Sequence, residues 1–406
     1  WNRMGEVSSN GQEVEWTTNT YHQFDGKNND VVQLQNGRLL NVHEDHESDE
    51  IRYKLGSYDE EENRVDWRDN PLEYLDINEV STDINYHRGE RYIDVLSPSI
   101  TVLDNGLVLA VSYTNHEVSG SKDLWYQLGE YYDYQMYWTD PVQYDTGHRP
   151  SVATLPNGEI LEVHDNHGNL YFNRGKFENG EIDWFSIGNK YDTGNSADVE
   201  ILDNGDIVEV HQGGILNETV YYNYGHQTEN GSIWWDTIGE KYDGGYRPNI
   251  ASLKGGYVLE THVSNSKTNS HLWKNVGFTQ NQTINWYSGE NQKFEFNDSS
   301  NPVSLQLDNG FILTMFDNKK TGTTWNYMSQ LLSNIGNGPL GQDYYHRWEG
   351  NTYSEFDGEN NDVVQLQNGY LLNVHEVHDS DIGLRYVLGR YKYEQSNRVV
   401  WWTCRW

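Results

Sequence analysis

The chain has 406 residues, 62 acidic against 28 basic side chains, and a formal net charge of −34. Nucleic-acid binding is disfavoured because phosphate contacts need clustered Lys and Arg, and no run of about 18 apolar residues exists to span a membrane. The acidic balance is typical of a solvated surface, and the length fits two or three ordinary domains or one large repeat domain. The β-branched and aromatic content, with 14% aromatic residues, favours strands over helices.

Three isolated features concern processing and modification. The only cysteine, Cys404, stands near the C-terminal end, so an internal disulfide is excluded, while an incidental thiol and intermolecular pairing both stay open. A chain that begins at Trp1 without a visible signal peptide is expected to be a processed or partial product. N-x-S/T sequons begin at Asn217, Asn230, Asn281 and Asn297.

A tight turn recurs along the chain and divides it into repeats. In chain order the turn residues are Asn36-Gly37, Asn105-Gly106, Asn157-Gly158, Asn204-Gly205, Gly255-Gly256, Asn309-Gly310 and Asn368-Gly369. The spacing gives seven copies of a unit of roughly 50 residues. Asn-Gly between alternating apolar runs is a strong hairpin signal.

Residues 148–194 show the repeated unit most clearly. Strands are expected at 149–155, 159–165, 169–175 and 182–194, joined by PNG, by a polar loop and by ENGE. Four antiparallel strands per repeat of this length indicate a propeller blade. The sequence therefore predicts an all-β fold, a seven-bladed β-propeller of four-stranded blades, whose Asn-Gly turns all lie on one face.

The two ends of the chain carry one hairpin too many for this ring. Residues 16–49 match 348–381, and WNRM at 1–4 resembles WNYM at 325–328. We therefore expect a surplus N-terminal β-hairpin at 1–20 and the propeller at 21–406. The hairpin packs on the outside of the ring, belongs to a longer array, or is donated to another protomer to form a homo-oligomer or filament.

Histidines recur at the end of the second strand of the repeat. The members are His43, His164, His211, His262 and His375, while Ser112 and Phe316 replace them in two repeats. Two interpretations stay open: the imidazole bonds a neighbouring backbone or carboxylate group, or it contacts a ligand. A metal site is disfavoured because neighbouring copies lie too far apart to share one ion.

A Tyr-Asp-x-Gly loop precedes the first strand and lies on the same face as the histidines. Its best copies contain Asp145 with Arg149 and Asp243 with Arg247, and weaker copies contain Asp192, Asp25 and Asp357. Gly and Asp suit a purely structural loop, but no turn needs the arginine, which favours ligand contact.

Aromatic residues begin the third strands near the same polar rim. They are Trp125, Tyr171, Tyr221, Trp273 and Trp325. Sugars present C–H faces to rings and hydroxyls to Asp, Asn, Arg and His, so this mixture suits a carbohydrate. The tryptophans of the fourth strands, Trp67, Trp184, Trp235 and Trp286, are interpreted mainly as packing between blades.

The repeat pattern YDxGxRPxVA, NGxxVEVH, LWYxxG and NGxIxW resembles the propeller lectins of the Photorhabdus lectin type. The resemblance covers nearly the whole chain, is sharpest over 142–290, and rests on a repeat consensus. It implies binding of monosaccharides such as fucose at several sites between adjacent blades, near the loops of Asp145, Asp192 and Asp243. Two repeats depart from the pattern at Ser112 and Phe316, and sites are not expected there.

We therefore expect a secreted, acidic, multivalent lectin that recognises monosaccharide units such as fucose on glycans or glycoconjugates. The alternative is a structural or self-assembling extracellular propeller module joined by hairpin exchange. An enzyme is not expected, because S-x-D-x-G-x-x-W boxes are absent and multivalent binders gain avidity from repeated sites. The predicted carbohydrate-binding residues are Asp145, Arg149, His164, Tyr171, Asp192, His211, Tyr221, Asp243, Arg247, His262 and Trp273; no catalytic residue, cofactor or metal is expected.

Overall fold

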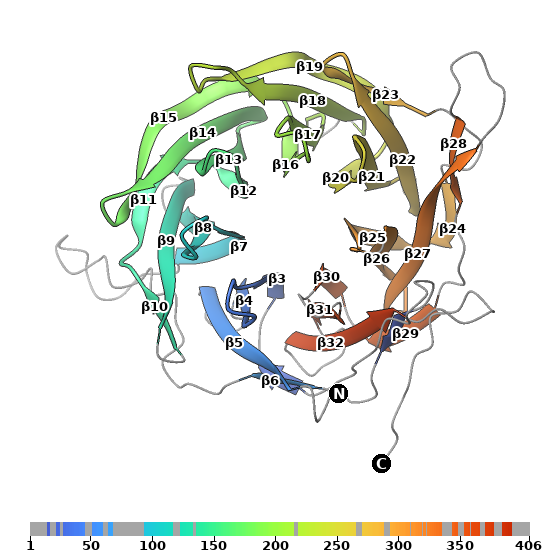
Figure 1. Cartoon of the computed structure of the whole chain (residues 1–406), viewed down its shortest axis with the longest axis horizontal. Helices are drawn as coiled ribbons and strands as arrows, with labels where there is room; N and C mark the ends of the chain where they lie inside the picture. The colour runs from blue at the N-terminus through green and yellow to red at the C-terminus, as the bar shows by residue number, and fades with distance from the viewer. Residues whose placement is uncertain are drawn as a thin grey trace.

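The chain forms a ring of antiparallel β-sheets in a computed structural model, seen down the ring axis in Figure 1. The described residues are 14–16, 22–24, 27–44, 51–59, 64–67, 93–116, 122–132, 135–214, 218–264, 270–287, 293–308, 310–318, 320–321, 323–334, 343–347, 353–357, 359–365, 370–376 and 384–391. None of them belongs to a helix, and the part of the chain described contains no helix that could cross a membrane. The prediction of an all-β propeller is confirmed.

The described strands form seven sheets, which we number in chain order. Sheet 1 contains β3 (Lys27–Gln33), β4 (Leu39–Glu44), β5 (Ile51–Asp59) and β6 (Arg64–Trp67). Sheet 2 contains β7 (Ile93–Val102), β8 (Val108–His116), β9 (Lys122–Tyr132) and β10 (Gln135–Trp138), and β11 (Val142–Thr146) also pairs with β9. Sheet 3 contains β12 (His148–Thr154), β13 (Glu159–Asn166), β14 (Asn169–Glu178) and β15 (Glu181–Asp192).

The numbering continues around the ring. Sheet 4 contains β16 (Asn195–Ile201), β17 (Ile207–Gln212), β18 (Val220–Gln227) and β19 (Ile233–Asp243). Sheet 5 contains β20 (Tyr246–Leu253), β21 (Tyr257–Val263), β22 (His271–Gln280) and β23 (Thr283–Trp286), with β24 (Lys293–Asn297) on β22. Sheet 6 contains β25 (Ser299–Gln306), β26 (Phe311–Asn318), β27 (Thr323–Asn334) and β28 (Asp343–Arg347), with β29 (Tyr353–Asp357) on β27.

Sheet 7 joins the two ends of the chain. Its strands β30 (Glu359–Gln365), β31 (Tyr370–Glu376) and β32 (Leu384–Tyr391) come from the C-terminal part. The N-terminal strands β1 (Val14–Trp16) and β2 (His22–Phe24) both pair antiparallel with β32. The described strand of the predicted N-terminal hairpin, β1, thus pairs with the last described strand of its own chain.

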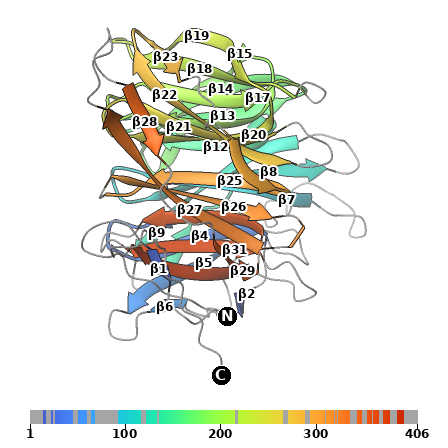
Figure 2. The same cartoon turned by 90° about the vertical axis from the view of Figure 1, so that its right-hand side faces the viewer.

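The first strand of each sheet lies nearest the ring centre, and these strands contact one another around the whole circle (Figure 1). In the view turned by 90°, the outer strands β15, β19 and β23 lie together at one edge of the ring (Figure 2). Pairing in sheet 3 places Thr154 beside Ile160 next to the Asn157-Gly158 turn, and His148 beside Asp165 at the opposite end. The turn and the loop that carries the chemistry therefore lie at opposite ends of the strand, as expected.

Every first strand contains a bulge with one residue in the left-handed region. These residues are Asn28, Ser97, Arg149, Ser196, Arg247, Asn301 and Asn360, all with φ between 45° and 53°. The pairing register shifts at each of them, for example between Tyr246 and Asn249. A bulge inserts an unpaired residue and turns the strand, so one backbone device is repeated once in each sheet.

Side chains two residues after each bulge link neighbouring sheets near the centre. Asp30 accepts a hydrogen bond from the Ile100 backbone amide at 2.8 Å, and Asp198 accepts one from Ile250 at 3.0 Å. The remaining links join Asp362 to Val31, Ser99 to Val152, Ser151 to Val199 and Asn249 to Ser304. Val303 occupies the corresponding position between sheets 6 and 7 and has no acceptor to offer.

Aromatic stacks hold the outer parts of sheets 2 to 5 together. Tyr144 stacks on Trp184 with ring centroids 4.6 Å apart, and Tyr191 stacks on Trp235 at 4.8 Å. Tyr242 stacks on Trp286 in the same way at 4.7 Å. In each pair the tyrosine belongs to one sheet and the tryptophan to the next, so these tryptophans pack between blades, as the sequence predicted.

Candidate functional site

The repeated loops meet the repeated histidines at the junctions between sheets. Asp145, Asp192 and Asp243 each approach the histidine of the following sheet, with Oδ2–Nε2 distances of 3.8, 3.6 and 3.8 Å to His164, His211 and His262. The other ring nitrogen, Nδ1, lies 3.1–3.2 Å from Glu162, Glu209 or Glu260, two residues earlier on the same strand. Alternation along a strand explains this pairing, because residues i and i+2 share one face.

A buried asparagine completes each of these junctions. Asn223 donates to Glu209 at 2.6 Å, and its own oxygen accepts from the Gly239 backbone amide at 2.6 Å. Asn173 and Asn275 donate to Glu162 and Glu260 in the same way. The glutamates are 0% exposed, so an otherwise costly buried charge is compensated by an imidazole and an amide.

The electrostatics of the junctions favour protonated histidines. Burial alone lowers the pKa of His211, but Glu209 and then Asp192 outweigh it, and the net pKa is raised above its ordinary value. His164 and His262 behave alike beside their own glutamates and aspartates. Burial raises the pKa of Tyr191 well above its usual range, with Glu209 adding to the effect, so this hydroxyl stays protonated.

The glycine of the Tyr-Asp-x-Gly loop lies directly on the imidazole. A Cβ on Gly194 would stand 2.5 Å from Cδ2 of His211 and 2.6 Å from the Gln212 carbonyl oxygen. Gly147 and Gly245 pack equally closely on His164 and His262. The loop therefore needs glycine for close approach rather than for an unusual φ.

The histidines are not exposed to a ligand. His164, His211 and His262 are 0–1% exposed, so their predicted role as direct ligand contacts is corrected: each imidazole joins two carboxylates within the protein. The aspartates of the loops keep part of their surface, with side-chain exposures of 16%, 13% and 25% for Asp145, Asp192 and Asp243.

The predicted aromatic residues lie beside the histidines. Tyr171 stacks on His164 and Tyr221 on His211, both with ring centroids 5.6 Å apart, and Trp273 pairs with His262 across β21 and β22. All three rings are half-buried. The structure thus brings aspartate, histidine and aromatic ring together at each of three junctions.

The two predicted arginines occupy bulge positions of sheets 3 and 5. Arg149 is 52% exposed, and its guanidinium lies 3.6 Å from Asp165 and 3.3 Å from the Ser196 hydroxyl. Arg247 is exposed and donates to the side-chain oxygen of Asn301. Both arginines thus contact the bulge residue of the next sheet.

At the other two histidine positions an asparagine stands where the first three have a glutamate. His43 and His375 bond Asn41 and Asn373 at 2.9 and 2.8 Å and are also buried. Where the repeat lacks histidine, Ser112 and Phe316 are 6% and 0% exposed. Within the described residues no group of three or more His, Cys, Asp or Glu side chains is arranged to hold a metal ion.

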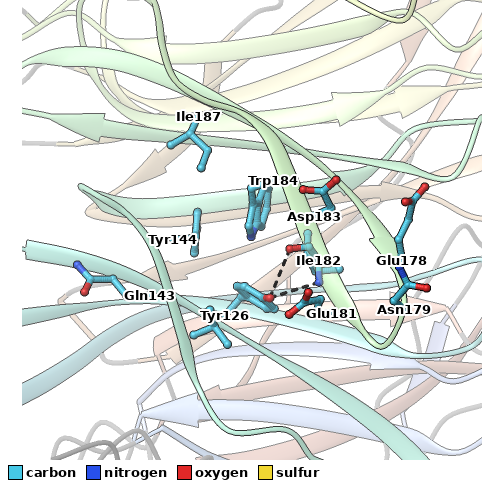
Figure 3. A pocket seen from close by; sticks show the side chains of 11 residues that line it. Tyr126, Gln143, Tyr144, Glu178, Asn179, Glu181, Ile182, Asp183, Trp184 and Ile187 are labelled. Carbon is cyan, nitrogen blue, oxygen red and sulfur yellow. Dashed lines mark hydrogen bonds between the residues drawn. The ribbon is translucent and has the colours of Figure 1, made fainter.

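A cavity of about 410 Å³ opens between sheets 2 and 3, beside the Asp145 loop (Figure 3). It is lined by Tyr126, Val142, Gln143, Tyr144, Glu178, Asn179, Glu181, Ile182, Asp183, Trp184 and Ile187. The stacked rings of Tyr144 and Trp184 form part of its wall, and the Tyr126 hydroxyl donates to the Ile182 carbonyl and accepts from its amide. Burial raises the pKa of Tyr126, so its hydroxyl stays a donor.

Three carboxylates border this cavity, and the sequence analysis had not selected them. Glu178, Glu181 and Asp183 are exposed and come from the end of β14 and the start of β15. There was little reason in the sequence to select these three carboxylates, because acidic residues at hairpin turns are common on a chain with 62 acidic residues. At the next junction Trp234 takes the place of Asp183, because each directly follows the matching isoleucine, Ile233 or Ile182. Trp234 is 61% exposed, so this groove has an aromatic ring where the first has a carboxylate.

No protein-family model and no curated protein matches this chain. Among solved structures, an ulvan lyase of polysaccharide lyase family PL25 superposes with a TM-score of 0.53 at 12% identity, over 92% of this chain and 96% of that chain. A candidate 6-phosphogluconolactonase from Bacteroides uniformis gives 0.50 at 11% identity, over 88% and 94%. An α-L-arabinanase from Penicillium chrysogenum, complexed with arabinobiose, gives 0.41 at 12%, over 72% and 92%. At such identities the likeness establishes the β-propeller fold alone.

One expectation from the sequence is overturned by these neighbours. The prediction that the protein is not an enzyme is contradicted, because the solved structure that superposes with a TM-score of 0.53 is named as a polysaccharide lyase, so the propeller fold does not exclude an enzyme. The absence of S-x-D-x-G-x-x-W boxes bears on sialidase-type enzymes alone.

Proposed function

We propose that the protein is a carbohydrate-binding propeller lectin with one blade per sheet, seven blades in all, and several binding grooves between neighbouring blades. The cavity between sheets 2 and 3 is the observation that carries this proposal. It combines the Tyr144–Trp184 stack, the exposed amide of Gln143 and three carboxylates in about 410 Å³. Sugar rings pack their C–H faces on aromatic and aliphatic groups and give hydroxyl hydrogens to carboxylates.

The repeated stacks at the next two junctions support multivalency. Tyr191–Trp235 and Tyr242–Trp286 present the same ring pair as Tyr144–Trp184, and the loop aspartates Asp145, Asp192 and Asp243 stand beside them. Linked weak sites bind a multivalent glycan more tightly than any site alone. In line with the resemblance to Photorhabdus-type lectins, we propose monosaccharide units such as fucose as ligands and a secreted location.

Calorimetric titration with methyl glycosides, starting with α-L-fucoside, tests the proposal. We expect dissociation constants between millimolar and micromolar, about −4 to −8 kcal/mol, because a small polar ligand in an open groove buries little area. The Asp183→Asn and Gln143→Ala variants, both at exposed positions, should each weaken binding at the first groove about tenfold. Lys190→Gln, on β15 but outside the cavity lining, is the control.

Binding stoichiometry decides between this proposal and a purely structural module. If no monosaccharide or glycan-array component binds, or if both cavity variants bind with unchanged affinity and stoichiometry, the cavity is not a sugar site.

A second candidate is cleavage of a bound glycan, and the carboxylates Glu178, Glu181 and Asp183 favour it, because glycoside hydrolysis uses paired carboxyl groups. The same protein preparation, incubated with polysaccharides, should then release reducing ends, and Glu181→Gln and Asp183→Asn should abolish that release. Binding without release in every polysaccharide tested would leave the lectin function alone.

A further inference from the structure

The seven bulges near the ring centre share one backbone conformation, with φ between 45° and 53°, and at three junctions a carboxylate accepts the bulge amide. The Ser97 amide donates to Glu44, Ser196 to Asp165 at 3.4 Å, and Asn360 to Asp317 at 2.8 Å. In each case the acid follows the histidine position of the preceding sheet by one residue. The bulge amide can therefore bind an anion, and at these three junctions a carboxylate of the same chain takes that place.

At Arg247 neither the preceding sheet nor the arginine's own sheet supplies a carboxylate at the position that follows the histidine. The preceding sheet supplies Gln212, an uncharged amide, where Glu44, Asp165 and Asp317 stand at three other junctions and Tyr113 and Val263 at two more. Its own sheet supplies Val263, paired with Tyr246, where sheet 3 has Asp165 paired with His148. The φ of Arg247 is 53°, identical to that of Ser196, so the two residues share the bulge conformation, but Arg247 lacks the carboxylate that accepts the Ser196 amide.

The Arg247 guanidinium is also left without an acid. Arg149, its counterpart in sheet 3, lies 3.6 Å from Asp165, whereas Arg247 contacts the neutral Asn301 side chain, and no described carboxylate lies within ion-pair distance of it. The side chain is exposed. The left-handed backbone conformation of Arg247 costs conformational energy. No ion pair with a described residue offsets that cost, although the chain carries a net charge of −34.

We propose that Arg247, its backbone amide and the Gln212 side chain bind one anionic group, a carboxylate or a sulfate, of an acidic sugar. Arginine forms charge-assisted, two-pronged hydrogen bonds to such planar or tetrahedral oxyanions. The inference deepens the proposed carbohydrate binding and rests on it for the identity of the ligand. The strongly acidic surface repels extended polyanions, so the ligand carries few charges, as a terminal uronate or a single sulfate ester does.

Paired methyl glycosides of glucuronic acid and glucose, which differ only at C6, provide the direct measurement. At low salt we expect the glucuronide to bind about tenfold more tightly, and the preference to shrink at high salt. A 6-sulfated glucoside in the same titration separates the two sources of the anion: preference for one over the other assigns carboxylate or sulfate.

Two variants and one control locate the site. Gln212→Glu places a carboxylate where Glu44 stands in sheet 1, and should occupy the amide and abolish the acid preference without removing the arginine. Arg247→Ser reproduces the bulge residue of sheet 4 and should also abolish it. Lys241→Ser, which removes an exposed positive charge from β19, should keep the full preference; thermal unfolding within a few degrees of the parent checks that each variant folds.

Inorganic sulfate separates failure of this inference from failure of the proposed function. If no sugar binds but sulfate binds and is lost in Arg247→Ser and Gln212→Glu, the anion site stands and carbohydrate binding falls. If acidic and neutral glycosides bind equally, or if both variants keep the acid preference, the anion site is wrong, while neutral-sugar binding at the cavity leaves the proposed function intact.

Discussion

Two groups of histidine junctions have the same backbone arrangement but differ in the residue that bonds the imidazole. At His164, His211 and His262 the residue two places earlier is a glutamate, whereas at His43 and His375 it is an asparagine. At the first three, the loop aspartate of the preceding sheet also lies 3.6–3.8 Å from the imidazole. The fold thus accepts either a glutamate or an asparagine two residues before the histidine, and we call the two kinds charged and neutral junctions after that residue.

The largest expected effect comes from removing a buried glutamate. Glu209→Ala leaves His211 and Asn223 without their common acceptor in the interior, and should lower the free energy of unfolding by about 3–5 kcal/mol. Asn373→Ala, the matched change at a neutral junction, should cost about 1–3 kcal/mol. Urea denaturation of both variants at pH 7 measures the difference; equal losses would contradict the distinction between charged and neutral junctions.

Close packing of the loop on the imidazole gives the next effect. Gly194→Ala adds a Cβ that would lie 2.5 Å from His211 and 2.6 Å from the Gln212 carbonyl oxygen. The backbone must shift, and we expect a loss of about 2 kcal/mol. Gly214→Ala, where a Cβ would meet nothing within 4 Å, should change stability by less than about 0.5 kcal/mol. A tolerated Gly194→Ala would mean that the loop is not held by this contact.

The pH dependence distinguishes the two junction types without breaking either. The pKa of His211 is raised in the folded protein, so its contribution is complete below the unfolded value of about 6.5 and is lost as pH rises through the folded value. Glu209→Asn, which rebuilds the arrangement of Asn373, should reduce this loss by about 1 kcal/mol between pH 6 and pH 9. Parallel pH profiles for parent and variant would show that the carboxylate does not set the titration.

The smallest predicted effect is a gain at the inner ring. Val303 interrupts the series of side-chain acceptors that link neighbouring first strands, and Asn249 shows that an asparagine fits the position. Val303→Asn should add a link between sheets 6 and 7 and raise stability by about 0.5–1 kcal/mol. Val303→Ala, which provides no acceptor, is the control, and a thermal melt of both variants compares them; a gain for the alanine variant would assign the effect to packing instead.

Because the sequence is repetitive, most of the fold could be predicted from it. The Asn-Gly turns, the alternating strands and the stacking tryptophans Trp184, Trp235 and Trp286 followed from patterns within about 50 residues. The same repetition placed Asp145, His164 and Tyr171 at one end of their strands: His164 pairs with Tyr171 across β13 and β14, and Asp145 lies 3.8 Å from His164. Local patterns sufficed there because strand alternation and hairpin geometry are local properties.

Most polar contacts between repeats could not be predicted from the sequence. The burial of His211 depends on Gly194 and Asp192 of the preceding sheet, and the completion of sheet 7 depends on β1 pairing with β32 across almost the full length of the chain. The cavity beside Trp184 and the uncompensated Arg247 likewise arise where two sheets meet. The sequence by itself determined the repeating strands, because their hydrogen bonds and periodicity are set within one repeat. Only the tertiary structure decided which polar groups are buried and which remain free for a ligand, because that depends on how closely separate sheets approach one another around the ring.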